Sequence, residues 1–266
     1  MENLLDGWGI TLATFSPLVG VAIMMVIPGG REHQHKMVAL VTSLWVAFIG
    51  VLLLIGFDMG HTAQLQFAVD KPWIDVISSR YLVGIDGMSL PLILLTMLIV
   101  PLCIIYSWDH FPEPVNPKAF LILILILETG MIGTFVAQDL VLFFVFFEVV
   151  LLPMFFMIAV WGGEDRRYAS LKFFLYTLFG SALMLVSFLA LFFLTGADTF
   201  SFTGLSYAVP AGGVSHTAQH WTLGGRFLGF DLKVSMFSFL TWPPDAHTQA
   251  PPVGAVILSA AVLKPR

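Results

Sequence analysis

The feature that most constrains this sequence is a series of apolar runs, each long enough to cross a membrane as one helix. The clearest, DLVLFFVFFEVVLLPMFFMIAVW, extends from Asp139 to Trp161 and carries one charge between its ends, on Glu148. At about 1.5 Å per residue, such a run crosses the roughly 30 Å hydrocarbon core of a bilayer. Only 11% of the residues are charged and 58% are hydrophobic. The sequence therefore predicts an integral membrane protein.

The distribution of the runs predicts an all-α fold, a polytopic bundle of transmembrane helices. We expect about seven full spans and a truncated eighth near the end of the chain. The predicted spans cover residues 8–28, 37–57, 85–107, 118–137, 139–162, 168–195 and 223–242. The segments 58–84 and 196–222 are expected to connect spans, the first as an amphipathic stretch.

Basic residues predict which side of the membrane the loops face. The short loops after the odd-numbered spans share an excess of them: Arg31, Lys36, Lys118, Arg166 and Arg167. Because Lys and Arg concentrate in cytoplasmic loops, we expect an external N-terminus. No basic block indicates nucleic acid as a partner, so the bilayer itself is the expected surrounding.

A carboxylate in the middle of a span needs a partner, because a lone charge there costs roughly 2.5–3.5 kcal/mol. The residues one turn away from Glu148 are all apolar, so its partner must come from another helix. Lys233, near the centre of the predicted span 223–242, is the natural candidate. Burial and pairing change the proton affinity of each group in opposite directions, so a pair of variable separation acts as a proton valve. The alternative is a static buried ion pair that only orders the bundle.

Two further charges lie in predicted spans. Glu128 is followed by Thr129 and by two glycines, Gly130 and Gly133, that permit close helix approach. It is a secondary candidate for the relay; the alternative is a protonated, locally hydrogen-bonded acid. Lys172 lies one turn into its helix, where its ammonium is expected to reach the cytoplasmic interface.

Prolines indicate irregular backbone near these charges. Pro153 removes a backbone donor and frees the carbonyl of Val149, which predicts a local break beside Glu148. The stretch TWPPDAHTQAPP, residues 241–252, forbids a continuous helix and includes His247. Such backbone within a membrane is tolerated around a wet cavity, so His247 is expected to relay protons between Lys233 and Lys264. An ordinary interfacial turn is the alternative.

Redox and metal chemistry find little support in the sequence. The single cysteine, Cys103, can supply neither an intrachain disulfide nor an iron–sulfur cluster, so any redox centre must lie on another polypeptide. His216 and His220 have a four-residue spacing, but they lie in a polar stretch and are expected to be solvated. No metal site and no cofactor site are predicted.

Five motifs carry a resemblance that runs in order along nearly the whole chain. They are VGIDGMSLP (83–91), ETGMIGTF (128–135), LFFVFFEVVLLPMFFMI (142–158), KFFLYTLFGS (172–181) and PDAHTQAP (244–251). The sequence resembles the antiporter-like subunit M, or chain 4, family of the proton-pumping NADH:quinone oxidoreductase, respiratory complex I. The resemblance implies that Glu148 is the carboxylate of the fifth helix, Lys233 its partner on a broken seventh helix, and Lys264 the connecting lysine of the eighth.

The same resemblance implies function and surroundings. The chain would be a membrane-arm subunit in the bacterial cytoplasmic membrane, moving protons in step with quinone reduction. NADH, FMN, iron–sulfur clusters and quinone would belong to partner subunits, and other membrane-arm subunits, including neighbouring antiporter-like ones, would be its partners. Residues 1–266 would form one transmembrane domain, with three N-terminal helices in 1–110 and a first antiporter-like repeat in 111–266.

The sequence also departs from that family. Its members are roughly twice as long and consist of two inverted halves, whereas this chain would hold only the first. Around the predicted break, Ser235, Ser238, Leu240 and Pro243 replace the usual residues, and Asp231 is an extra acid. These changes favour a C-terminally truncated member that lacks the second half-channel. Two alternatives therefore stay open: a subunit of a cation/proton antiporter or membrane-bound hydrogenase, and a fragment that does not pump.

Overall fold

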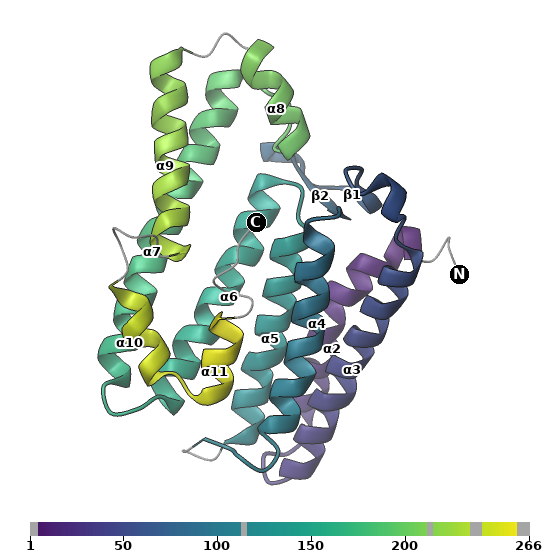
Figure 1. Cartoon of the computed structure of the whole chain (residues 1–266), viewed down its shortest axis with the longest axis vertical. Helices are drawn as coiled ribbons and strands as arrows, with labels where there is room; N and C mark the ends of the chain where they lie inside the picture. The colour runs from purple at the N-terminus through teal and green to yellow at the C-terminus, as the bar shows by residue number, and fades with distance from the viewer. Residues whose placement is uncertain (1–4, 113–115, 212–214, 235–240, 260–266) are drawn as a thin grey trace.

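The computed structural model describes residues 5–112, 116–211, 215–234 and 241–259 and is mostly helical, as predicted (Figure 1). Within these residues, six helices are long and apolar enough to cross a membrane. They overlap the first six predicted spans: α2 (Ile10–Val26), preceded by the helical turn η1 (Leu5–Gly9), α3 (Glu32–Gly56), α4 (Ser89–Tyr106), α5 (Pro117–Val136), α6 (Leu140–Trp161) and α7 (Arg166–Thr195).

The seventh predicted span, residues 223–242, starts too late. Helix α9 (His216–Val234) begins at His216 rather than at residue 223. Helix α10 (Trp242–Gln249) comes after residues 235–240, which lie outside the described chain. Helix α9 is also too polar to be one of the six, since Arg226, Asp231 and Lys233 interrupt its apolar residues.

The proline-rich stretch forms the short helices α10 and α11. Two prolines of α10 occupy its first turn, where a missing backbone donor costs nothing. Helix α11 (Pro252–Ile257) follows and starts the predicted eighth span. Lys264 lies outside the described residues.

Both predicted connections contain regular structure. Segment 58–84 holds an antiparallel hairpin of β1 (Gln66–Ile74) and β2 (Ser79–Ile85), with the short helical turns η2 (Met59–His61) and η3 (Asp75–Ile77). Segment 196–222 holds α8 (Phe202–Ala211) and the first turns of α9. The all-α prediction therefore omitted a hairpin, and the helices within the second connection were not predicted.

Helix α5 lies at the centre of the bundle, and 78% of its most apolar stretch is buried, compared with 33% for α3. Two of its glycines allow α6 to approach. A Cβ on Gly130 would lie 2.8 Å from Cγ2 of Val150, and one on Gly133 would overlap the ring of Phe146. The predicted close approach is therefore confirmed, and it holds α6 directly against the most buried helix of the protein.

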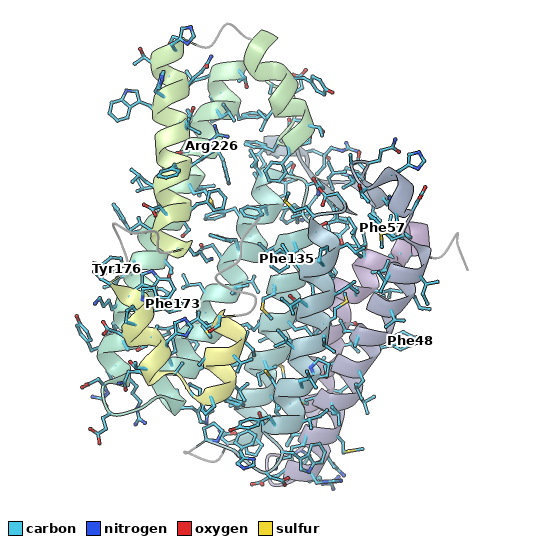
Figure 2. All side chains as sticks on the ribbon, in the orientation of Figure 1. Phe48, Phe57, Phe135, Phe173, Tyr176 and Arg226 are labelled. Atoms are coloured by element: carbon cyan, nitrogen blue, oxygen red, sulfur yellow. The ribbon has the colours of Figure 1, made fainter. Side chains whose placement is uncertain are left out.

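The outer faces of the bundle are apolar. In Figure 2, Phe48 points away from α3, whereas Phe135 lies inside the bundle; Phe48 is 52% exposed and Phe135 2%. Other exposed large apolar residues of α3 fall on the same stripe at helical spacing: Val41, Leu44, Trp45, Val51 and Ile55. A continuous apolar stripe of this length suits contact with lipid, so the chain is a multi-pass membrane protein.

Asp139 joins the hairpin to the start of α6. Its carboxylate accepts hydrogen bonds from the hydroxyl of Ser79 (2.9 Å) and the backbone N–H of Arg80 (3.1 Å). It also accepts from the backbone N–H groups of Val141 (3.0 Å) and Leu142 (3.1 Å), which makes it the N-cap of α6. Asp139 is fully buried, so these four donors take the place of its hydration.

Two contacts fix α10 beside α7 and α9. The ammonium of Lys172 on α7 lies 2.7 Å from a carboxylate oxygen of Asp245 on α10. The indole N–H of Trp242 donates a 2.7 Å hydrogen bond to the backbone oxygen of Leu232, and Trp242 is fully buried. The end of α9 and the start of α10 are therefore tied together directly across residues 235–240.

The Asp139 junction predicts a large loss of stability on substitution. Asp139→Ala removes the N-cap of α6 and leaves two hairpin donors without an acceptor, so the free energy of unfolding should fall by about 2 kcal/mol or more. Unfolding of the purified chain by SDS titration in detergent measures this change. Asp109→Ala, at an exposed site, is the control; equal effects of both substitutions would contradict the role of Asp139.

The pair of Lys172 and Asp245 predicts a measurable coupling. Their side chains are 18% and 38% exposed, so solvent screening limits the coupling to about 0.5–1 kcal/mol. A double-mutant cycle with Lys172→Met and Asp245→Asn, followed by SDS unfolding, measures it. Strictly additive effects would show that the ion pair does not hold α10.

Candidate functional site

Lys233 carries a charge into the interior of the protein. It lies in the last turn of α9 and is 2% exposed. Its ammonium nitrogen donates a 3.0 Å hydrogen bond to the backbone oxygen of Phe147 on α6 and lies 3.0 Å from the centre of the Phe147 ring. A carbonyl oxygen and an aromatic face both attract a cation. The carbonyl oxygen and the ring of Phe147 therefore form a binding position for the ammonium, which we call the Lys233 seat.

The seat of Lys233 is on the helical turn that carries Glu148. Glu148 is half-buried, and its Oε1 is buried with no hydrogen-bond partner. The two charged groups act on one another electrostatically but form no ion pair within 4.0 Å. The structure thus brings the predicted acid and amine to the same turn of α6, with the ammonium on the peptide oxygen just before the acid.

The prediction of a local break in the helix beside Glu148 is wrong. Helix α6 continues from Leu140 to Trp161 through Pro153. The carbonyl that Lys233 binds is that of Phe147, two residues before the Val149 carbonyl that the proline frees. A proline in a long helix can be absorbed without a break when packing on both sides holds the helix, and α6 packs between α5 and α7.

Glu128 is a buried acid without partners in the described chain. It is fully buried on α5, and neither of its carboxylate oxygens has a hydrogen-bond partner. The local hydrogen bond expected in the alternative interpretation is therefore absent from the described residues, and the neighbouring hydroxyl of Thr129 is unpartnered as well. An ionised carboxylate in such a place costs several kcal/mol, so Glu128 requires a bound proton or internal water.

His247 is half-buried on α10, and its Nδ1 lies 3.5 Å from the hydroxyl of Ser259. Its helix is held to the last turn of α9 by the hydrogen bond of Trp242. In the sequence, residues 235–240 separate His247 from Lys233. Its predicted partner Lys264 is outside the described residues. The relay beyond Lys233 therefore stays a prediction.

Sequence reasoning assigned three other charged residues incompletely. Lys172, expected to reach the interface, has a specific partner in Asp245. Asp231, noted only as an extra acid, is 6% exposed with an unpartnered Oδ1, two residues from Lys233. Asp139 was not singled out. The useful signal was a carboxylate next to an apolar run at a helix start, which is typical of an N-cap.

The described residues bring no group of three or more His, Cys, Asp or Glu side chains together in a way that could hold a metal ion. The arrangement instead gathers buried acids and an amine in an apolar bundle. Such groups can bind and release protons, and their charge states depend on one another. Proton transfer is the chemistry that this set of residues can perform.

Comparisons with known proteins agree with this geometry. A family model described as NADH-ubiquinone oxidoreductase chain 4, amino terminus, matches residues 18–134, and one described as NADH:quinone oxidoreductase/Mrp antiporter, TM, matches residues 137–265. NADH-quinone oxidoreductase subunit M of Rhodobacter capsulatus is 40% identical over 277 residues, which cover 99% of this chain and 52% of that protein. NADH-ubiquinone oxidoreductase chain 4 of Chondrus crispus is 39% identical, over 96% of this chain and 50% of that protein.

Solved structures show the same fold. A chain of respiratory complex I from Thermus thermophilus with bound NADH superposes with a TM-score of 0.79 at 27% identity, over 94% of this chain and 49% of that one. A chain of the archaeal membrane-bound sulfane sulfur reductase superposes with a TM-score of 0.76 at 20% identity, over 96% and 39%. The chain spans about half the length of the curated relatives it matches. It belongs to the antiporter-like subunit M, or chain 4, family of NADH:quinone oxidoreductases.

Proposed function

We propose that this chain is a proton-translocating membrane-arm subunit of an NADH:quinone oxidoreductase. The observation that carries the proposal is the buried ammonium of Lys233 on the turn of α6 that carries Glu148, without an ion pair between the two. A fixed structural bridge would be expected to pair them, whereas a proton-exchanging pair needs both groups free to change their charge. The family membership supports the same function.

The proposed step is a proton transfer from Lys233. The protonated amine is stabilised by the Phe147 carbonyl, the Phe147 ring and the negative charge of Glu148. When Glu148 becomes neutral or moves away, the ammonium loses part of that stabilisation and releases its proton to internal water, becoming a neutral amine. The acceptors that we propose next are His247 and Lys264, with Glu128 as a secondary proton store.

The proposal extends to the surroundings of the chain. We place it in a bacterial cytoplasmic membrane with its N-terminus outside, beside other membrane-arm subunits that include neighbouring antiporter-like ones. NADH, FMN, iron–sulfur clusters and quinone would bind partner subunits. The one cysteine supports this division, because Cys103 is buried in α4 and a cluster needs several thiolates.

Cation/proton exchange is the second candidate function. It is favoured by one observation, the family model over residues 137–265, whose description also includes Mrp antiporters. The two functions differ in what drives proton movement. NADH-driven acidification of inverted membrane vesicles would support the first, whereas acidification that depends only on a sodium gradient would support the second.

Substitutions at the two central residues test the proposed step. In inverted vesicles that contain the assembled complex with this chain, Glu148→Gln and Lys233→Ala should each lower the NADH-driven proton gradient by about tenfold or more. A pH-sensitive dye measures the gradient, and a native gel shows that assembly persists. The controls are Glu164→Gln and Lys71→Ala, at exposed positions, which should leave the gradient unchanged. Full gradients in both central variants would contradict the proposal.

Lys233→Arg separates proton exchange from a fixed positive charge. Arginine keeps the charge but cannot release its proton, so the assembled variant should build no gradient. If Lys233 only orders the bundle, the arginine variant should pump like the parent chain. A gradient that survives this substitution would therefore favour the static interpretation.

A further inference from the structure

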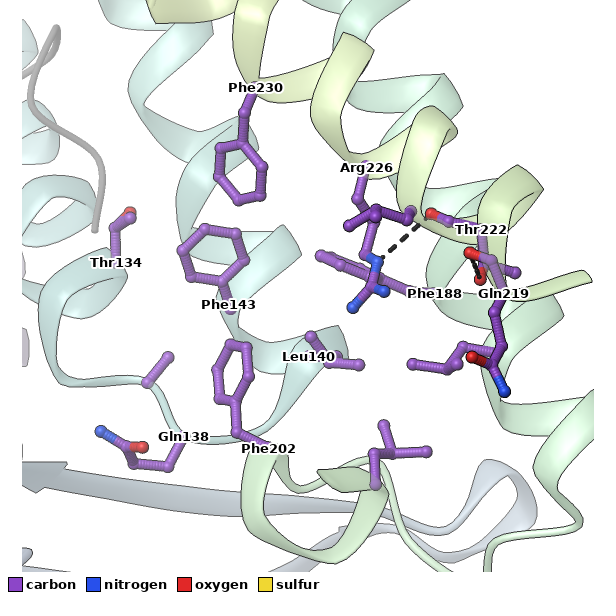
Figure 3. Close-up of a pocket in the computed structure, with 14 residues that line it drawn as sticks. Thr134, Gln138, Leu140, Phe143, Phe188, Phe202, Gln219, Thr222, Arg226 and Phe230 are labelled. Atoms are coloured by element: carbon purple, nitrogen blue, oxygen red, sulfur yellow. Dashed lines mark hydrogen bonds between the residues drawn. The ribbon is translucent and has the colours of Figure 1, made fainter. Parts of the chain in front are cut away.

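A cavity of about 670 Å³ lies between α7, α8 and α9 on one side and the junction of α5 and α6 on the other (Figure 3). Most of its walls are apolar. The side chains that form them include Leu140, Phe143, Phe188, Leu191, Phe202 and Leu205. Its size is within the range of about 300–1,000 Å³ that is typical of ligand pockets.

One cation points into this cavity. Figure 3 shows the guanidinium of Arg226 directed from α9 toward Leu140. Its Nε donates a 3.2 Å hydrogen bond to the backbone oxygen of Thr222, in its own helix. Within the described chain the guanidinium forms no ion pair, and no lining residue is acidic. The remaining guanidinium donors of Arg226 are therefore available to a ligand.

A second donor lines the same cavity. The side-chain nitrogen of Gln138 is buried and has no hydrogen-bond partner in the described structure. Gln138 precedes the capping residue Asp139, so the tight turn between α5 and α6 fixes its position. The Gln138 amide lies across the cavity from Arg226 (Figure 3). The preference for an anion therefore rests on the guanidinium, which carries donors and no acceptor.

The apolar walls define the rest of the ligand. A small inorganic anion would gain nothing from the phenylalanines and leucines, whereas a hydrocarbon chain would bury its surface against them. At the rim, Leu223 and Phe202 are 58% and 40% exposed, so the cavity opens onto an apolar surface of a membrane protein. A lipid chain can enter from there without crossing water.

We propose that this cavity binds one anionic phospholipid, with its phosphate on Arg226 and an acyl chain along Phe143, Phe188 and Leu191. A planar guanidinium matches the paired oxygens of a phosphate. The bound lipid would neutralise the only charge that lines the cavity in the described chain and fill the space between α9 and the α5–α6 junction. The rings of Phe143 and Phe230 neighbour that of Phe147, but no residue of the proposed relay lines the cavity, so lipid binding and proton transfer are tested separately.

Native mass spectrometry of the full chain, purified in a mild detergent, tests the proposal. Phosphatidylglycerol and phosphatidylcholine with the same acyl chains are titrated separately. We expect one phosphatidylglycerol per chain, retained at least about tenfold more tightly than phosphatidylcholine. Arg226→Gln should remove this preference, while Arg167→Gln, at an exposed site in the first turn of α7, should keep it.

Two further measurements make each outcome decisive. Leu191→Trp fills the apolar part of the cavity and should weaken phosphatidylglycerol binding with Arg226 intact, which covers the case in which Arg226→Gln fails to fold. Inorganic phosphate at millimolar concentration should not displace the lipid. Displacement by phosphate would show a site for a free anion, and equal binding of both lipids, or full binding in either cavity variant, would overturn the proposal.

Discussion

The structure depends on keeping the ammonium of Lys233 inside an apolar bundle. The effective penalty for burying an ion is several kcal/mol, and a full ion pair is the usual way to offset it. Here three weaker interactions offset the penalty: a peptide oxygen, an aromatic ring and the field of a nearby carboxylate. Each contribution is weaker than an ion pair, so the charge is tolerated without being locked.

The surrounding helices keep this arrangement in register. On one side, the glycines of α5 let α6 approach closely, and Asp139 fixes the start of α6 to the hairpin. On the other side, Trp242 and the pair of Lys172 and Asp245 hold α10 against α7 and the end of α9. The helices that carry the acid and the amine are therefore fixed by contacts outside the pair, and the charged groups need not bind each other to hold the fold.

The sequence predicted the elements that depend on composition and length. The six apolar spans follow from transfer into lipid, and the meeting of Glu148 and Lys233 follows from the cost of lone charges in a membrane. Other features depend on contacts that leave no local signal. The acceptor of Lys233 is a backbone oxygen, which every residue has, and Asp245 lies 73 positions from Lys172. The hairpin was missed because β1 shows no regular alternation of buried and exposed residues and because long apolar runs on both sides dominate the pattern.

The start of α9 was also not predicted correctly from the sequence. Its first turns contain Gln219 and Thr222, which face the cavity rather than lipid, so hydropathy placed the helix too late in the chain. The cavity itself could not be predicted, because it arises where α9 packs on α7 and separates from α5 and α6. Arg226 fell near the start of the predicted span 223–242, and nothing in the sequence indicated that it faces a cavity.

The seam between α7 and α9 bears on how the protein is made. A Cβ on Gly180 would lie 2.9 Å from the backbone oxygen of Gly229, and one on Gly229 would lie 2.6 Å from that of Gly180, so the two backbones are in contact. With Arg226, Asp231 and Lys233, α9 gains too little from lipid to partition from the translocon alone. Helix α7 offers it a ready surface as it leaves the ribosome. We therefore expect α7 and α9 to insert into the membrane as a helical pair, with α7 stabilising α9.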